Sequence, residues 1–168
     1  MESPIIGYCF SHEKFLSLNF EQFLILCKKA NIKTLEINDE YLNTVSQQQQ
    51  QHQLSSPLPN IIIHKLTDML SRELVDDDKT VHLFLEKFRN LIKRNESTIL
   101  MIDNLESVTK LLNRQIQYTL LNEIEDLYVP PFISITDESI AHKNIQQLLT
   151  NHNIQYPVIC KPIRAHGM

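Results

Sequence analysis

The chain has 168 residues, which is enough for one full domain or for one small domain and part of another. Only Gly7 and Gly167 are glycines, so there is no complete glycine-rich phosphate loop of the P-loop or dinucleotide-binding type. Apolar residues make up 42% and charged residues 21%, which is typical of a soluble domain. The formal net charge of −4 argues against broad nucleic-acid binding.

Charge is unevenly distributed along the chain. Residues 139–168 contain no acidic residue and carry a net charge of +3, whereas residues 1–138 carry a net charge of −7. A C-terminal segment without carboxylates is suited to binding an anion. The alternative is that acidic residues are absent from this short segment by chance.

The three cysteines, Cys9, Cys27 and Cys160, are widely spaced and form no CxxC pair. This spacing is neither a disulfide framework nor a zinc signature, and it favours a reducing compartment. The N-terminus lacks the pattern of a secretory signal, and no apolar run approaches the roughly 18 residues of a membrane span. We therefore predict a cytoplasmic protein with no membrane partner.

Strand and helix patterns alternate in the first part of the chain. Residues 5–10 are an apolar run rich in β-formers, and the polar residues 11–14 predict a loop. Asn19 is a candidate N-cap, with Gln22 as its capping-box partner, for a helix with apolar residues at helical spacing. Further strands are predicted at residues 34–37, 61–63 and 98–103, and helices at residues 81–94 and 107–112.

A low-complexity segment interrupts this alternation. Residues 47–51 are all glutamine, and a stretch rich in serine and proline follows up to Pro59. This composition is typical of a disordered surface loop, which we predict over residues 43–59. A functional polyglutamine segment is the alternative.

In the second part of the chain, Pro130 and Pro131 follow a helix predicted at residues 118–127. Beyond them we predict strands at residues 132–135 and 157–161 and a helix at residues 140–149.

Strands that alternate with helices predict an α/β fold with a largely parallel sheet. We place a boundary at residue 113. Residues 1–113 form a complete, Rossmann-like α/β domain, whereas residues 114–168 contain too few strands to bury both faces of a sheet.

Polar side chains follow the predicted strands at their carboxyl ends, where open α/β sheets bind ligands. This rule selects residues 11–14, 64–65 and 103. Lys14 and Lys65 could meet a polyanion, each as a flexible point charge. The alternative is that both are ordinary solvated lysines, with Asp68 pairing with Lys65.

Lys161 ends a predicted apolar strand, and this position predicts partial burial. A buried ammonium group requires an anionic partner, because an unpaired buried charge is costly. Arg164, His166 and Gly167 follow closely, and such a turn suits phosphate oxygens. Pairing of Lys161 with an acid from elsewhere is the alternative.

Other candidate chemistry is weak. No two histidines have metal-ligand spacing, and no Ser/His/Asp or Cys/His arrangement can be argued from the sequence. We therefore predict neither a catalytic residue nor a metal ligand. Three aspartates at residues 76–78 favour the exposed start of a helix.

Several motifs resemble those of one family when they are taken in order. The chain contains GYCFSHEK at residues 7–14, LNF at 18–20, IIHKLTD at 62–68, LLNR at 111–114, PPF at 130–132 and PVICKPIRAHG at 157–167. Together they resemble the inositol 1,3,4-trisphosphate 5/6-kinases, also called inositol tetrakisphosphate 1-kinases. The resemblance runs from residue 5 to residue 167.

The resemblance implies an N-terminal α/β domain and the start of the central domain of an ATP-grasp fold. It implies magnesium-dependent transfer of the γ-phosphoryl group of ATP to an inositol hydroxyl. The residues it assigns are Lys14, Lys65, His166 and Gly167 to the substrate side and Arg114 and Lys161 to ATP.

The family continues beyond the position of Met168, into the region that carries its magnesium ligands. We therefore expect an incomplete and inactive fragment of an inositol polyphosphate kinase. The full-length form would be a monomer that binds inositol polyphosphate and ATP and no nucleic acid. The alternative is a non-catalytic α/β module for interaction or inositol-phosphate binding.

Overall fold

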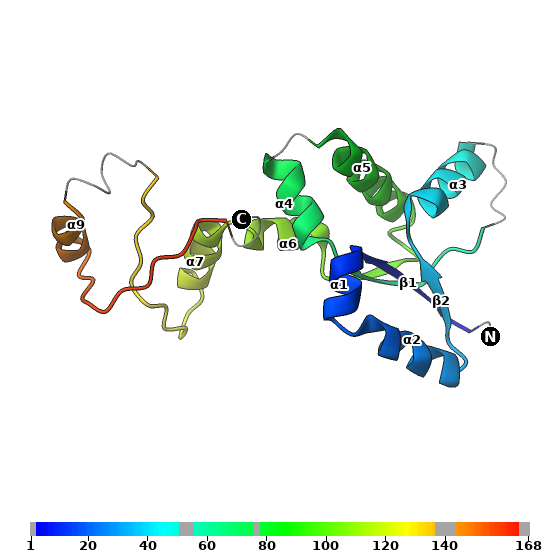
Figure 1. Cartoon of the computed structure of the whole chain (residues 1–168), viewed down its shortest axis with the longest axis horizontal. Helices are drawn as coiled ribbons and strands as arrows, with labels where there is room; N and C mark the ends of the chain where they lie inside the picture. The colour runs from blue at the N-terminus through cyan, green and yellow to red at the C-terminus, as the bar shows by residue number, and fades with distance from the viewer. Residues whose placement is uncertain (1–2, 51–55, 76–77, 137–143, 165–168) are drawn as a thin grey trace. The chain divides into compact units, whose positions relative to one another are not determined.

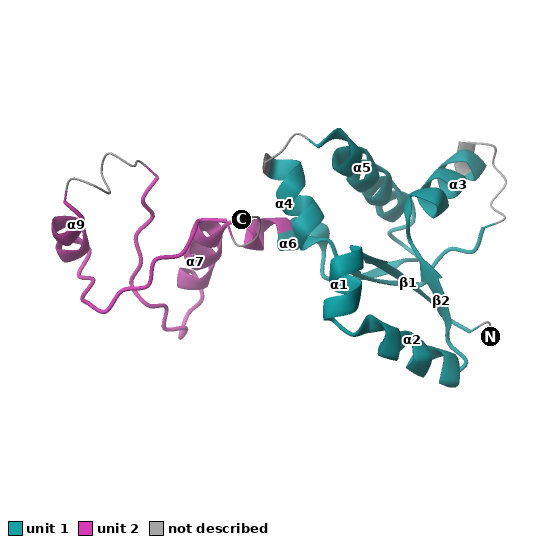
Figure 2. Cartoon of the chain, viewed as in Figure 1, with its two compact units in different colours: residues 1–108, 167 teal, residues 109–166, 168 magenta. Residues whose placement is uncertain are grey.

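The computed structural model describes residues 3–50, 56–75, 78–136 and 144–164. The chain divides into two compact units, one that ends at Val108 and one that begins at Thr109 (Figure 2). The division falls inside helix α6 (Leu105–Leu111), a few residues before the predicted boundary at residue 113.

A parallel sheet forms the centre of the first unit (Figure 1). Its strands are β1 (Ile5–Phe10), β2 (Lys33–Glu36), β3 (Ile61–Lys65) and β4 (Leu100–Ile102), in the order β2-β1-β3-β4. The register places Gly7 beside Leu35 of β2 and Ile62 of β3. This sheet confirms the predicted α/β fold and the strands predicted in the first part of the chain.

Helices pack on both faces of the sheet (Figure 1). They are α1 (His12–Ser17), α2 (Phe20–Lys29), α3 (Asp39–Gln50), α4 (Thr67–Val75) and α5 (Lys79–Arg94). On one face, Phe20 of α2 packs its ring against Tyr8 and Phe10 of β1, with centroids 5.4 and 4.3 Å apart. On the other face, Phe88 of α5 meets the ring of His64 edge-on at 6.2 Å.

Helix α5 has the apolar face that its sequence predicts. The buried side chains recur at helical spacing and are Val81, Phe84, Leu85, Phe88 and Leu91. Asp78 caps the helix, because its carboxylate accepts hydrogen bonds from the backbone N–H groups of Thr80 and Val81 at 3.1 and 3.2 Å. Asp78 therefore lies at a helix start as predicted, whereas residues 76–77 lie outside the described residues.

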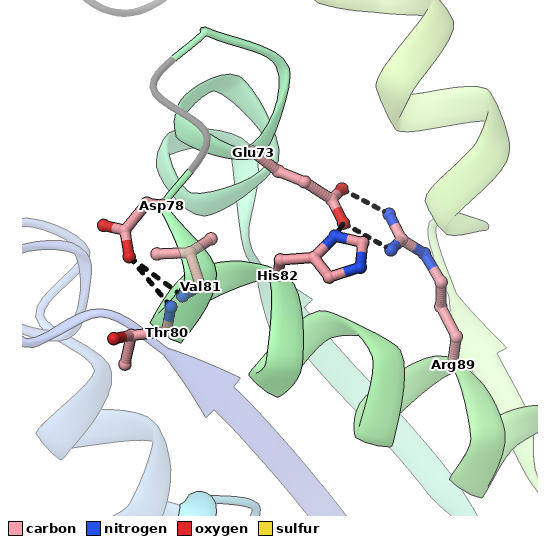
Figure 3. Close-up of polar contacts among 6 residues, drawn as sticks. All are labelled: Glu73, Asp78, Thr80, Val81, His82 and Arg89. Carbon is pink, nitrogen blue, oxygen red and sulfur yellow. Dashed lines mark hydrogen bonds and ion pairs between the residues drawn. The ribbon is translucent and has the colours of Figure 1, made fainter.

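Charged side chains link α4 to α5 through the carboxylate of Glu73 (Figure 3). The guanidinium of Arg89 donates to both carboxylate oxygens of Glu73, at 2.7 and 2.6 Å. His82 Nδ1 lies 3.2 Å from the same carboxylate. The hydrogen bonds from Arg89 are the main reason that the pKa of Glu73 is lowered from its ordinary value.

Gly7 lies where the backbone of β1 passes close to two other segments. A Cβ atom added to Gly7 would lie 2.8 Å from Cδ1 of Ile37 and 2.9 Å from Cβ of Pro59. Both neighbours are fully buried, so neither has free space to move into. Close packing therefore requires glycine at this position.

The structure corrects the disorder predicted at residues 43–59 only for residues 43–50. Residues 43–50 belong to α3, residues 51–55 lie outside the described residues, and residues 56–59 are irregular. Glutamine is a good helix former, and the side chains of Leu42 and Val45 on α3 are almost completely buried. Tyr41 also donates its hydroxyl to the carbonyl of Pro57 at 3.0 Å, which links α3 to the segment before β3.

Two further helices lie where the sequence predicted none. Helix α1 replaces the loop predicted at residues 11–14, because Ser11 caps it, with its hydroxyl accepting from the N–H of Lys14 at 3.4 Å. Helix α4 begins at Thr67, with only Leu66 between it and the end of β3. Asn19 does precede α2, but it adopts a left-handed conformation and its side chain makes no capping hydrogen bond.

The second unit contains α7 (Arg114–Asn122) and α9 (Ile145–Asn151). The helix predicted at residues 118–127 therefore starts earlier, because the side chain of Asn113 caps the N–H groups of Gln115 and Ile116. The strands predicted at residues 132–135 and 157–161 are not formed. A strand needs a neighbour for its backbone hydrogen bonds, and in the described part of this unit only an isolated bridge joins Asn113 to Arg164.

Candidate functional site

Lys14 lies just beyond the carboxyl end of β1. The strand ends at Phe10, Ser11 caps the next helix, and Lys14 occupies the first turn of that helix. Its side chain is half-buried. The short connection therefore places Lys14 near the carboxyl edge of the sheet.

Lys65 is the last residue of β3 and pairs in register with Phe10 of β1. Because β1 and β3 are neighbours in the sheet, Lys65 and the segment that carries Lys14 lie at the same edge. Among the described residues, neither ammonium group forms an ion pair, and Lys65 does not pair with Asp68. The edge therefore presents two lysines without a carboxylate partner.

His64 lies directly before Lys65 and points into the protein, where its side chain is buried. Its Nε2 lies 2.5 Å from the carbonyl oxygen of Asp103, the residue that follows β4. A carbonyl oxygen can only accept, so Nε2 carries the proton and donates it. Burial is the main cause that lowers the pKa of His64 from its ordinary value, and this shift favours the neutral imidazole.

In the second unit, the two residues assigned to ATP lie on segments that contact each other. The backbone N–H of Arg114 donates to the carbonyl of Ile163 at 2.7 Å. Lys161 Nζ lies 3.3 Å from the hydroxyl of Tyr118, one turn after Arg114 on α7. The ring of Tyr118 packs against Phe132 at 5.0 Å, so three segments of this unit meet around one tyrosine.

The expected partial burial of Lys161 is wrong. Lys161 is exposed, and Cys160 of the same predicted strand is exposed as well. Both follow from the missing strand, because a segment without a neighbouring strand has no sheet face to bury. Lys161 therefore needs no buried anion, and its contact with Tyr118 is a surface contact.

His166 and Gly167, which the resemblance assigns to the substrate, lie outside the described residues. In the part of the chain that the structure describes, no group of three or more His, Cys, Asp or Glu side chains could hold a metal ion. The same residues contain no helix long and apolar enough to cross a membrane.

The structure contains a shallow hollow of about 370 Å³ that none of the predicted site residues lines. It lies between α2 and the start of β2, and its lining includes Leu24, Lys28 and Lys33. It is therefore at the amino end of β2, whereas Lys65 is at the carboxyl end of β3.

Curated relatives match the chain over almost its whole length. The inositol-tetrakisphosphate 1-kinase of Xenopus laevis is 29% identical over 173 residues, and that of Danio rerio is 30% identical over 176 residues. Each match covers 96% of this chain. The chain resembles the inositol-tetrakisphosphate 1-kinases. This similarity confirms the resemblance that the motifs indicated.

The chain spans 39% of the length of each of these inositol-tetrakisphosphate 1-kinases. No protein-family model matches it. The assignments of Lys14, Lys65, Arg114 and Lys161 remain predictions, although each pair lies on neighbouring segments of one unit.

Two features of the site were not predicted from the sequence. The position of Tyr118, four residues after Arg114, is a helical spacing that could have placed both on one face of a helix. The hydrogen bond from His64 to Asp103 joins residues 39 positions apart in the sequence. Only the pairing of β3 with β4 brings them together, so no local pattern signals it.

Proposed function

We propose that the chain is the substrate-binding part of an ATP-dependent inositol polyphosphate kinase. The observation that carries this proposal is the position of Lys14 and Lys65 at neighbouring strand ends without carboxylate partners in the described structure. Two such cations suit phosphate groups on one small ring. Similarity to the inositol-tetrakisphosphate 1-kinases supports the same substrate class.

Arg114 and Lys161 would bind the phosphates of ATP. They suit this role chemically, because both are cationic and lie on contacting segments of the second unit. ATP would supply the transferred phosphoryl group, and catalysis of this transfer depends mainly on positioning and on electrostatic stabilisation. No described set of carboxylates suits magnesium, so we assign no step to it.

Isothermal titration calorimetry with inositol 1,3,4-trisphosphate tests the proposal. We expect the double variant Lys14→Ala/Lys65→Ala to bind at least tenfold more weakly than wild type, because it removes both cations from the edge. Raising the salt concentration should weaken wild-type binding, because salt screens exposed charges.

The matched control is Lys28→Ala/Lys33→Ala, which removes two exposed lysines of the first unit away from the carboxyl edge. It should bind within about twofold of wild type, because general attraction between a polyanion and any two lysines is small at physiological salt. Equal binding by wild type and both double variants would overturn the proposal.

That outcome would favour a non-catalytic interaction module. The observation on its side is a pair of apolar side chains on α7, Ile116 and Leu120, which are each 41% exposed at a spacing of one helical turn. Interaction surfaces are built around contiguous exposed apolar side chains, and this pair would belong to such a surface.

A further inference from the structure

The carboxyl edge of the sheet carries an acid beside its two lysines. Asp103 follows β4 directly, one residue beyond the pair formed by Ile63 and Ile102. It therefore lies next to His64 in register, one residue before Lys65. Asp103 is exposed, so its carboxylate is available to a ligand at this edge.

The backbone of Asp103 adopts a left-handed conformation, with φ of 64°. Aspartate and asparagine adopt this conformation more readily than other side chains, and all five described residues with a positive φ are Asn or Asp. The hydrogen bond from His64 Nε2 to the carbonyl oxygen of Asp103 fixes the turn in place. The next residue, Asn104, then caps α6 by accepting from the N–H of Glu106 at 2.8 Å. A buried imidazole therefore contacts the turn through which the chain leaves β4.

Residues 64–68, at this edge, include buried polar atoms that reduce the stability of the fold. Three side-chain atoms there are buried and have no hydrogen-bond partner in the described structure: His64 Nδ1, Thr67 Oγ1 and Asp68 Oδ1. An unpaired buried polar atom reduces stability, so such atoms are rare in folded proteins. Their concentration beside Lys65 calls for an explanation, and a functional site at this edge supplies one.

We propose that Asp103 determines specificity at the substrate edge, and that His64 is the residue that positions it. In this arrangement Lys14 and Lys65 bind phosphates of a polyol ring, and the carboxylate of Asp103 accepts a hydrogen bond from a free ring hydroxyl. The proposal rests on the proposed function, because it requires an inositol polyphosphate at the same edge.

A carboxylate distinguishes the two kinds of ring substituent. It attracts a hydroxyl, which can donate a hydrogen bond, and it repels a phosphate of the same charge. The edge should therefore prefer a partly phosphorylated ring over one on which every position carries phosphate. A phosphoryl acceptor needs such a free hydroxyl.

Calorimetry with two probes tests this preference. Inositol 1,3,4-trisphosphate has free hydroxyls, whereas inositol hexakisphosphate has none, and the measured quantity is the ratio of their affinities. For Asp103→Ala we expect a loss of about tenfold in trisphosphate affinity and equal or stronger binding of hexakisphosphate. The ratio should therefore shift by tenfold or more toward hexakisphosphate.

The His64 variants separate positioning from general stability. His64→Leu removes the donor to the carbonyl of Asp103 and should shift the ratio in the same direction as Asp103→Ala. His64→Gln keeps an N–H group at the position of Nε2 and should restore the wild-type ratio. General destabilisation would lower both affinities together and leave the ratio unchanged.

The matched control is Glu96→Ala, which removes an exposed acid before the amino end of β4. It should leave the ratio at its wild-type value. Asp103→Ala keeps the test decisive if His64→Leu fails to fold, because Asp103 is exposed.

The possible outcomes are distinguishable. If wild type binds neither probe, the proposed function fails. If wild type binds through Lys14 and Lys65 but Asp103→Ala leaves the ratio unchanged, the specificity role is overturned and the proposed function stands. If Asp103→Ala shifts the ratio and a folded His64→Leu does not, the positioning role of His64 is overturned.

Discussion

At the scale of single residues, Gly7 shows how one missing side chain constrains the fold. The strand that leads to the lysine-bearing edge passes Ile37 and Pro59 at distances that leave no room for a Cβ atom. Gly7 is therefore needed for packing in the strand, although it lies within the GYCFSHEK motif. Its role is structural, and it supports the site by keeping β1 between its two neighbours.

Gly7→Ala should lower the free energy of unfolding by about 1–3 kcal/mol, because the added methyl group overpacks a buried region. Urea denaturation measures this change. Ile37→Val removes the Cδ1 atom that the methyl group meets, so the two changes should couple in a double-mutant cycle. Purely additive effects, or an unchanged midpoint for Gly7→Ala, would contradict this account.

At the scale of elements, the ion pair between Glu73 of α4 and Arg89 of α5 stabilises the packing of these two helices. Glu73 and Arg89 are held by two parallel hydrogen bonds, and the Glu73 side chain is only 14% exposed. The pKa of Glu73 is lowered from its ordinary value of 4.5. The contribution of the charged form is therefore complete above pH 4.5 and is lost as the pH falls through the lower folded-state value.

Glu73→Gln should cost about 1 kcal/mol at pH 7, a modest value because solvent screens the half-exposed Arg89. The difference from wild type should shrink as the pH falls below 4.5. Urea denaturation at several pH values measures both effects. The control Glu86→Gln removes an exposed carboxylate on α5 and should change stability little at any pH. A difference from wild type that is independent of pH would rule out the ion pair as its cause.

The elements also show what sequence patterns can predict. Helix α5 was predicted well because its buried residues repeat at helical spacing, and strands β1, β3 and β4 were predicted well because each contains an apolar run. Helix α3 was missed because its glutamines, read as low complexity, are held in a helix by Leu42 and Val45. The strands at residues 132–135 and 157–161 were wrong because a strand depends on a partner that a local pattern does not reveal.

The same reasoning applies to the site. The rule that ligands bind at carboxyl strand ends selected Lys14, Lys65 and Asp103, because the order of strands and loops can be read along the chain. The hydrogen bond between His64 and Asp103 could not be predicted, because it depends on the register of β3 against β4.

At the scale of the whole molecule, the two units differ in how much apolar surface they bury. Most of the buried hydrophobic residues belong to the first unit, and Leu112 and Leu149 are those described after Val108. A unit with few buried side chains should unfold locally more readily than a unit with a packed core.

Hydrogen exchange measured by mass spectrometry should therefore show slow exchange in β1, β3 and α5 and faster exchange in α7 and α9. The comparison is internal, since all these elements belong to one chain and have hydrogen-bonded backbones. Equal protection of α7 and α5 would show that the second unit is as stable as the first.

Because the glutamine run begins within α3, the fold should tolerate variation in the number of glutamines. Val45 is buried on α3, and Pro57 is tied to Tyr41, so the chain is fixed on both sides of the run. Added glutamines would lengthen only the connection between these fixed points, and doubling such a connection costs about 0.6 kcal/mol in closure entropy. Proteins that differ in the number of glutamines here should therefore share the same sheet and the same lysine-bearing edge.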